Sequence, residues 1–538
     1  MRIFRALLVL FLVVIFTELD QTPEWTGHRV MRLSRQEHYN QALMRIPRRA
    51  ERADRSTLAM TFVSAGSFSA MLHSTDHQIL YGRRGTGKTH ALLYLSDLIE
   101  RTGDVAVYVD LRTIGSAGGL YADSSLSPAV RGTHLLVDTL EAIQNELLAV
   151  AIDGEIGDQN TLVLALGALA EAATAVEVVG EVEQETTLGG RAESRVGIEL
   201  TVPPNVKVSA TSGRSAMAET RLRRSGIERH HVVFGPLSRA LRGIARALGG
   251  ARLWLLLDEW SSVPLDLQPL LADLLRRSVL PIPGITVKIA TIEHRSRFSQ
   301  PAPNGDYVGI EVGADAASAV SLDDFMIFDN VHSRAQEFFG QLFHNHTSVH
   351  LSAMIYQPPV DPDSFIEATF DRNTFSELVR AAEGAPRDAI NIAALAAQHA
   401  HDELIGLSDV RRAARDWYLR DKQTAIHANE PARQMLRLLI DEVVGRHRSR
   451  TFLLDQLIVR HETIDELYDA RLLHVLRRGI ADPKNPGTLY DGFAIDYGCY
   501  VDLRSRPRDR GGWMNSPRGV PPDEFNYARE AIDLAKLA

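Results

Sequence analysis

The chain has 538 residues, of which 45% are hydrophobic and 24% are charged. These proportions are typical of a globular protein long enough for roughly two to four domains. The formal net charge of −9 excludes a generally basic nucleic-acid protein, so any contact with nucleic acid must come from a local patch. The single cysteine, Cys499, excludes an internal disulfide framework and zinc sites built from several thiolates, and it fits a reducing compartment.

The first residues resemble a signal peptide only in part. An unbroken apolar run from Ala6 to Phe16 follows Arg2 and Arg5, as in the charged and hydrophobic regions of such a peptide. No small-x-small cleavage motif follows, and the run is short for a membrane span. We therefore expect residues 1–45 to be an apolar and basic extension, with residues 1–20 either a peripheral anchor or the product of a mis-assigned start codon.

A glycine-rich turn between a strand and a helix predicts a phosphate-binding loop. The apolar residues Ile79 to Tyr81 end a strand, residues 82–89 match G-x-x-x-x-G-K-[ST], and leucines at helical spacing follow. Glycines let the backbone N–H groups point at phosphate oxygens, the lysine reaches the β- and γ-phosphates, and the threonine hydroxyl ligates Mg²⁺. The helix N-terminus adds a partial positive charge. The residues expected to contact ATP are Gly82, Arg83, Arg84, Gly85, Thr86, Gly87, Lys88 and Thr89.

Two further strands predict the rest of a nucleotide site. Residues 104–112, "DVAVYVDLR", form a buried strand, and the run "LWLLL" at 253–257 suits a central parallel strand buried on both faces. The second strand ends in Asp258 and Glu259. Beside a phosphate loop, we expect Asp258 to hold Mg²⁺ together with Thr89, and Glu259 to orient the attacking water. Without that loop, a solvated acidic turn would be the simpler interpretation.

A third apolar strand, residues 284–298, ends in polar residues. Ligands of open parallel sheets lie at the carboxyl ends of the strands, so Thr291 is expected near the γ-phosphate or the attacking water. Either Arg295 or Arg297 is a candidate for a charge-stabilising arginine, acting in cis or toward a neighbouring subunit. A loop of exposed charges is an equally open interpretation for each arginine.

The order of these motifs resembles an AAA+ ATPase. The segment "EGAPRDAINIA", residues 383–393, is similar to the Gly-x-Pro-Arg motif in the lid helix of replication initiators of the origin-recognition type. The resemblance implies that Arg387 reaches from a helical lid to the γ-phosphate. With the motif residues above, the candidate catalytic set is Lys88, Asp258, Glu259, Thr291, Arg387 and Arg295, and the expected Mg²⁺ ligands are Thr89 and Asp258. Arg295 resembles the arginine that STAND-type nucleotide switches carry after this strand.

The C-terminal part resembles a winged helix, which docks DNA in that family. Helical patterns at 432–444 and from 463 precede a strand that runs to 480, a Pro/Gly/Asn turn, and a second predicted strand at 493–503. Arginines such as Arg471, Arg477 and Arg478 are candidates for phosphate contacts. Interleaved acidic residues leave a protein-binding role open.

A long segment separates the strand at 104–112 from the strand at 253–257, and a compact core does not need a connection of this length. Residues 160–174 are expected to be helical, while 175–188 and 195–212 alternate like an exposed hairpin. The basic stretch 221–231 is interpreted as a solvated linker. We expect an insertion at about 119–230 that faces DNA, a partner protein or another copy of the chain.

Together these patterns predict an α/β fold with a P-loop AAA+ parallel-sheet core, an insertion, a helical lid and a winged helix. The expected divisions are 1–45, 46–330 for the core, 331–425 for the lid, 426–503 for the winged helix and 504–538 for a tail. The expected function is that of an ATP-hydrolysing, DNA-binding protein of the initiator or loader kind, in the cytoplasm, where ATP is available. The alternatives are a STAND-like nucleotide switch and a scaffold whose winged helix binds protein in signalling or defence.

Overall fold

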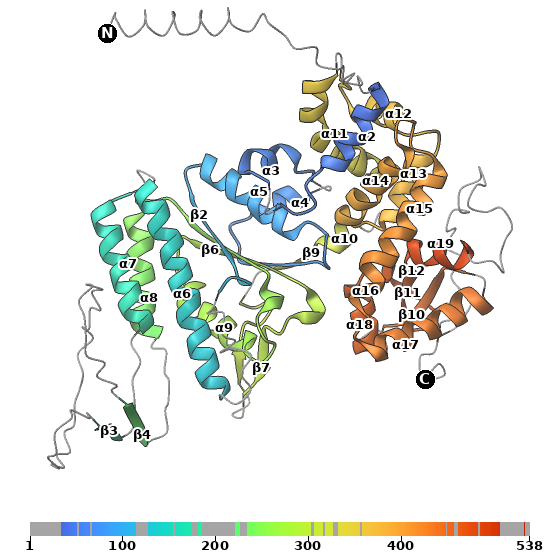
Figure 1. Cartoon of the computed structure of the whole chain (residues 1–538). Helices are drawn as coiled ribbons and strands as arrows, with labels where there is room; N and C mark the ends of the chain where they lie inside the picture. The colour runs from blue at the N-terminus through green and yellow to red at the C-terminus, as the bar shows by residue number, and fades with distance from the viewer. Residues whose placement is uncertain are drawn as a thin grey trace, which may run out of the picture.

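A computed structural model describes residues 34–505 and residue 532. Within 34–505 it leaves out 51–52, 65–66, 115–126, 154–156, 175–180, 186–220, 226–233, 303–305, 316–317, 327–331, 356–357, 448, 457–460 and 483–484. Figure 1 shows a central sheet flanked by helices, a helical bundle beside it, and a small C-terminal sheet below that bundle. The apolar run at 6–16 and nearly all of the tail lie outside the described residues. No helix in the described ranges is long and apolar enough to cross a membrane.

The central sheet has five parallel strands in the order β2-β5-β6-β1-β9. They are β1 (Gln78–Tyr81), β2 (Val105–Asp110), β5 (Leu253–Asp258), β6 (Ile285–Thr291) and β9 (Ser318–Ser321). Every residue of β5 and β6 is buried, as expected for central strands covered on both faces. This order places the end of β6 directly beside the end of β1.

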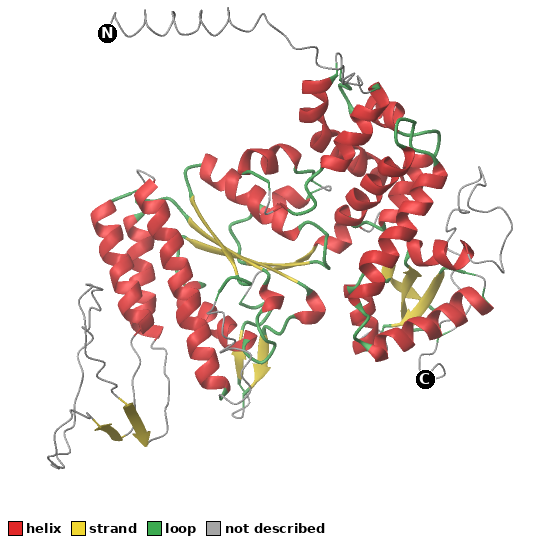
Figure 2. Ribbon diagram, viewed as in Figure 1, coloured by secondary structure: helices red, strands yellow, loops and turns green. Residues whose placement is uncertain are grey.

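Helices cover both faces of this sheet (Figure 2). On one face, α5 (Lys88–Arg101), α3 (Arg55–Thr61) and α4 (Phe68–Leu72) lie near Trp254 and Leu256. On the other, α6 (Pro128–Asp153), α7 (Gln159–Thr174), α8 (Phe234–Ala247) and α9 (Gln268–Leu274) pack on the alternate residues of β5. The two-residue repeat of a strand therefore builds two apolar cores from one run of sequence.

The inserted segment contributes α6, α7 and the hairpin β3 (Glu181–Glu185) and β4 (Arg221–Ser225). The helix predicted at 160–174 is present as α7. The basic stretch beginning at 221 forms β4, so its interpretation as a linker was wrong for residues 221–225. The second half of the predicted hairpin, 195–212, lies outside the described residues. A short hairpin, β7 (Ser299–Pro301) and β8 (Tyr307–Gly309), follows the end of β6.

The lid is a helical bundle connected to the sheet by α10 (Leu322–Met326). Its helices are α11 (His332–Met354), α12 (Pro362–Thr369), α13 (Thr374–Ala382), α14 (Pro386–Ala400) and α15 (Leu407–Trp417), followed by a π-helical turn at Tyr418–Lys422 and α16 (Gln423–Ala425). Helix α2 (Arg35–Arg45) shares the core of this bundle through Tyr39 and Leu43. Part of the expected N-terminal extension is thus packed among the lid helices.

The winged helix consists of α17 (Glu430–Leu439), a π-helical segment (Ile440–Arg446), β10 (Thr451–Asp455), α18 (Glu462–Asp469), β11 (Leu473–Ala481), β12 (Leu489–Ile495) and α19 (Tyr497–Ser505). Its antiparallel sheet has the order β10-β12-β11. The strand predicted at 493–503 was wrong beyond Ile495, because Asp496 begins a helix there. The fold class predicted from the sequence, a parallel-sheet core with a lid and a winged helix, is confirmed.

Candidate nucleotide site

The predicted phosphate loop, residues 82–89, connects β1 to α5. Gly85 and Gly87 have φ angles of 88° and 96°, in the left-handed region that glycine adopts without strain. The loop curls back on itself: Lys88 Nζ donates to the carbonyl oxygens of Gly82 at 2.6 Å and of Arg83 at 3.1 Å. Burial lowers the pKa of Lys88, and nearby carboxylates, first Glu259 and Asp258, oppose that shift.

The Asp-Glu strand meets this loop, although the two segments are far apart in sequence. Asp258 is fully buried at the end of β5, where its Oδ2 accepts a hydrogen bond from the Tyr108 hydroxyl at 2.9 Å. Burial raises the pKa of Asp258, and hydrogen bonds from Thr89 and Tyr108 oppose that shift. Thr89 and Asp258 are therefore neighbours, with the hydroxyl and carboxylate oxygens that Mg²⁺ prefers.

Glu259 continues this strand into a strained turn. Its φ of 56° lies in the left-handed region, which a residue with a long side chain rarely adopts. The Glu259 carboxylate lies 3.7 Å from Arg112 Nη1, and Arg112 also holds Asp110 at 2.6 Å. Burial and the neighbouring Asp258 raise the pKa of Glu259. The Glu259 carboxylate is therefore close to Arg112 and within electrostatic range of Asp258 and Lys88.

The end of β6 carries the two other expected residues of the core. Thr291 is buried, its hydroxyl is hydrogen-bonded to that of Ser296, and its carbonyl oxygen accepts from the N–H of Gly82 at 3.1 Å. Arg295 Nε donates to Asp469 Oδ2 of the winged helix at 2.9 Å. Arg297 is exposed, and its backbone N–H donates to the side chain of Gln268. Of the two candidate arginines, Arg295 is therefore the one engaged beside the site.

The lid arginine lies directly against the phosphate loop. The Arg387 N–H donates to the Gly85 carbonyl oxygen at 3.2 Å, and a Cβ at Gly85 would come within 2.7 Å of Arg387 Cβ. Pro386 occupies the first turn of α14, where a missing N–H costs nothing. Arg387 Nε is buried without a hydrogen-bond partner, and burial lowers the pKa of this guanidinium. Arg387 is thus a half-buried cation whose Nε has no hydrogen-bond partner among the described residues.

The loop residue Arg83 has a role that the sequence did not indicate. Its backbone N–H donates to Asp323 Oδ2 at 2.9 Å, and its Nε donates to Asp323 Oδ1 at 3.1 Å. Its two terminal nitrogens donate to the Glu383 carbonyl oxygen and to His474 Nδ1, each at 2.7 Å. Arg83 thus joins the core, the lid and the winged helix, and its N–H is occupied by a carboxylate instead of pointing at a ligand.

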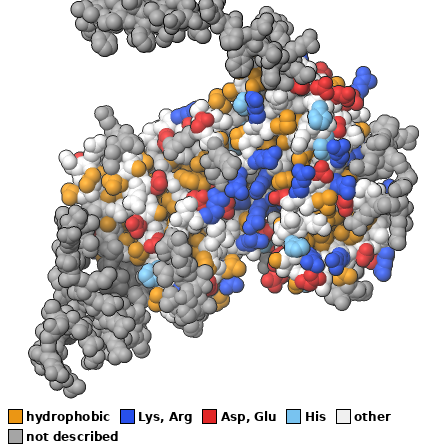
Figure 3. Space-filling model, viewed as in Figure 1, with side chains coloured by type: hydrophobic (Ala, Val, Ile, Leu, Met, Phe, Trp, Pro, Cys, Tyr) orange, Lys and Arg blue, Asp and Glu red, His pale blue; other side chains and the backbone are white. Residues whose placement is uncertain are grey.

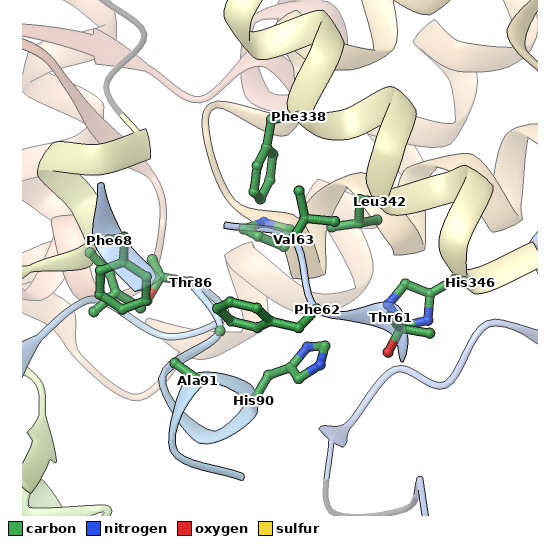
Figure 4. A pocket seen from close by; sticks show the side chains of 13 residues that line it. Thr61, Phe62, Val63, Phe68, Thr86, His90, Ala91, Phe338, Leu342 and His346 are labelled. Carbon is green, nitrogen blue, oxygen red and sulfur yellow. The ribbon is translucent and has the colours of Figure 1, made fainter. Parts of the chain in front are cut away.

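An apolar pocket lies beside the phosphate loop (Figure 4). It is lined by residues of the segment before β1, of the loop, of α5 and of the lid: Thr61, Phe62, Val63, Phe68, Thr86, Gly87, His90, Ala91, Leu322, Phe338, Leu342, His346 and Pro386. The His90 ring lies 5.5 Å from the ring of Phe62 and 6.2 Å from that of His346. His346 Nδ1 is buried without a hydrogen-bond partner, and burial lowers the pKa of His346 to about 4. The pocket offers stacking surfaces and one polar edge.

Positive charge is concentrated around the loop. In Figure 3, Lys and Arg side chains gather in the middle of the face shown, where the half with the parallel sheet meets the helical half. Partial burial and the charge of Arg295 lower the pKa of Arg84, and the charge of Arg471 adds to this effect at both Arg84 and Arg387. Arginines that repel one another in this way favour a polyanionic ligand.

The winged-helix arginines proposed as phosphate contacts differ in exposure. Arg471 is buried and forms ion pairs with Asp388 and Asp421. Arg477 and Arg478 are both exposed on β11, and Arg478 lies 3.6 Å from Asp324 of α10. Lys484, which the sequence also offers as a phosphate contact, lies outside the described residues. Since a buried arginine in two ion pairs cannot reach a duplex, the interpretation of Arg471 as a DNA contact was wrong for this conformation.

Comparison of the sequence with protein-family models and with curated proteins gives no match. Among solved structures, the chain is similar to Cdc6p from Pyrobaculum aerophilum at 11% identity over 86% of this chain and 96% of that chain, with a TM-score of 0.30. The structure of the Aeropyrum pernix Orc1 protein in complex with DNA has 12% identity over 87% of this chain and 96% of that chain, with a TM-score of 0.29. The structure of Drosophila ORC bound to DNA has 10% identity over 90% of this chain and 95% of that chain, also with a TM-score of 0.29.

Proposed function

We propose that this protein binds a nucleoside triphosphate with Mg²⁺ at the junction of β1, β5 and α5, and hydrolyses it. The observation that carries the proposal is the meeting of Thr89 and Lys88 with Asp258 and Glu259. Two segments with the chemistry of phosphate and magnesium binding have no structural reason to converge on one strained, partly unsatisfied site. Such a convergence is typical of a phosphoryl-transfer centre.

Each residue has a role that follows from its position. Lys88 and the loop N–H groups neutralise the phosphates, while Thr89 and Asp258 hold the metal ion, which supplies charge neutralisation when bound. Glu259, whose pKa is raised by burial and by the neighbouring Asp258, orients the water. Thr291 lies next to the loop and contacts the terminal phosphate. Arg387 donates its unused N–H groups to the phosphates from the lid.

The apolar pocket lined by Phe62 and His90 receives the base of the same nucleotide. It adjoins the loop at Thr86 and Gly87, and the aromatic side chains that line it offer apolar contact to a flat heterocycle. His346 Nδ1 then gains a partner among the polar atoms of the base, which removes the cost of leaving it unsatisfied. The proposed ligand is therefore a complete nucleotide and not a free anion such as phosphate.

Binding of fluorescent ATP to the full chain, compared between wild type and Lys88→Ala, tests the site. The variant is expected to lose binding by more than about a hundredfold, because the buried cation facing the phosphates is gone. The matched control is Arg101→Ala, because Arg101 lies on the exposed end of α5. Lys288→Ala is not suitable as a control, since that lysine is buried in β6. Equal ATP affinity in Lys88→Ala and wild type would contradict the assignment.

The output of the nucleotide site has two candidates. DNA binding is supported by the winged-helix fold and by the exposed Arg477 on its wing. A nucleotide-controlled switch is supported by the ion pair between Arg295 and Asp469, since it ties a residue of the site to the winged helix in the same chain. A DNA mobility shift at two salt concentrations distinguishes them: phosphate contacts weaken steeply with salt, and Arg477→Ala is expected to reduce the slope by about one.

A further inference from the structure

The turn between α18 and β11 projects from the winged helix into the nucleotide site. It consists of Asp469, Ala470 and Arg471, and Asp469 and Arg471 are buried at its two ends. Arg471 has a φ of 61°, and its Nη1 donates to the Arg84 carbonyl oxygen in the phosphate loop at 3.4 Å. A turn from one domain is therefore seated on the loop of another.

Asp469 occupies the environment that a phosphate group requires. Its side chain is 3% exposed, and its Oδ2 accepts from Arg295 Nε at 2.9 Å. Its second oxygen, Oδ1, is buried without a hydrogen-bond partner. The charge of this carboxylate also acts on Lys88 and Arg84. An anion held by Arg295 and close to the loop cations resembles a bound phosphate in charge and in partners.

The rest of this turn is held from the side of the winged helix and the lid. Arg471 is paired with Asp388 at 3.1 Å and with Asp421. One turn earlier in α18, Asp465 lies 3.2 Å from His294. The Arg83–His474 hydrogen bond adds a further contact between the loop and β11. These contacts fix the position of Asp469, so its carboxylate cannot move away while the winged helix stays docked.

We propose that Asp469 competes with the terminal phosphate of the nucleotide for Arg295, so that a triphosphate loosens the docked winged helix and a diphosphate does not. The proposal rests on the nucleotide site proposed above. Two anions cannot share one set of cations without strong repulsion in a buried site. A ligand that binds one of two arrangements better shifts the population toward it. The winged helix is thereby the element that reports which nucleotide is bound.

Hydrogen exchange of the full chain tests this mechanism, because peptides that cover residues 462–475 report docking directly. Wild-type protein is measured with Mg²⁺ and either ADP or the non-hydrolysable β,γ-imido analogue of ATP, and the affinity for each nucleotide is measured in parallel. We expect faster exchange in these peptides with the triphosphate analogue only. Equal exchange with both nucleotides, at saturation, would overturn the proposal.

Asp469→Asn keeps the shape of the side chain and removes its charge. This variant is expected to bind the triphosphate analogue about tenfold more tightly relative to ADP than wild type does, a typical coupling between two sites. Asp469→Glu keeps the charge and should retain the wild-type preference, which separates electrostatics from misfolding. Glu462→Gln, at the exposed start of the same helix, is the matched control and should leave the ratio unchanged.

The outcomes separate the two proposals. If wild type binds neither nucleotide, the proposed nucleotide site fails, and the competition falls with it. If wild type binds both nucleotides but Asp469→Asn leaves their affinity ratio unchanged, only the competition is overturned. A changed ratio in Asp469→Asn and a wild-type ratio in Asp469→Glu and Glu462→Gln would support both.

Discussion

Two clusters of buried charge lie close together and differ in how they are balanced. In the nucleotide site, burial dominates: the pKa values of Asp258 and Glu259 are raised and that of Lys88 is lowered. The second cluster lies where the lid meets the winged helix. Burial also disfavours the charged forms of Asp496 and Lys422 there, but their ion pairing outweighs this effect. The pKa of Asp496 is lowered to about 2 and that of Lys422 is raised.

The difference separates a structural network from a functional site. Lys422 Nζ lies 2.9 Å from Asp388 Oδ2 and also contacts Asp496, which is hydrogen-bonded to His474 Nε2 at 3.3 Å. Every charge there has an opposite partner within the protein. The candidate nucleotide site keeps a buried guanidinium nitrogen on Arg387 without a partner and a strained Glu259, which is why we propose an external anion and cation there.

The largest effect is expected from breaking the balanced network. Lys422→Met leaves the buried Asp388 and Asp496 without their shared cation, which should destabilise the fold by about 3–5 kcal/mol. Chemical denaturation of the full chain measures the change. Arg420→Met, on the exposed side of the same π-helical turn, is the matched control. A loss below about 1 kcal/mol would mean that the ion pairs do not determine stability there.

Glu259→Gln tests the other cluster. The amide keeps the size of the side chain but cannot accept a proton from water, so hydrolysis should slow by about a hundredfold or more while ATP still binds. Unfolding of the variant should be little changed, because the ion pair of Glu259 with Arg112 is long, at 3.7 Å, and partly exposed. Steady-state turnover and nucleotide affinity, measured on one preparation, check both statements. A wild-type turnover rate would remove Glu259 from the mechanism.

The sequence predicts those parts of the site whose residues lie next to one another in the chain. The phosphate loop and the Asp258–Glu259 pair each lie at the end of an apolar strand, where residue type and spacing are fixed by the phosphates and the metal ion. Their roles stay predictions, but the structure brings them together. Arg387 was found through a family resemblance, since a lone arginine at a helix start carries no signal of its own.

The missed parts depend on how distant segments dock. Asp469 lies on a helix with several other acidic residues, and nothing in that pattern distinguishes a buried carboxylate from a solvated one. Arg83 was expected to serve the phosphates, yet its side chain joins three domains. The predicted strand at 493–503 ran past the end of β12, although an aspartate at 496 is a typical helix N-cap. In the structure Asp496 Oδ1 accepts a hydrogen bond from the N–H of Cys499 at 3.0 Å, as such a cap does.

Acid stability sharpens the contrast between the two clusters. Because the pKa of Asp496 in the fold, about 2, lies below the unfolded value near 3.9, its contribution is complete above pH ~4. That contribution, about 2 kcal/mol, is lost as the pH falls through the folded value. Asp496→Asn should therefore flatten the stability curve between pH ~4 and ~2, measured by denaturation at several pH values. An unchanged slope would assign acid unfolding to other carboxylates.

The smallest expected effect comes from Arg112, which links Glu259 to the end of β2. Its Nη1 lies 3.7 Å from the Glu259 carboxylate, close enough to attract that carboxylate away from a water on the terminal phosphate. A partly exposed pair of this kind is worth at most about 1 kcal/mol. Arg112→Ala is thus expected to raise basal ATP turnover by up to about fivefold, with Arg101→Ala as the exposed arginine control. Slower turnover in Arg112→Ala would instead mean that Arg112 holds Glu259 in its working position, and the strained turn alone would then have to account for the orientation of the base.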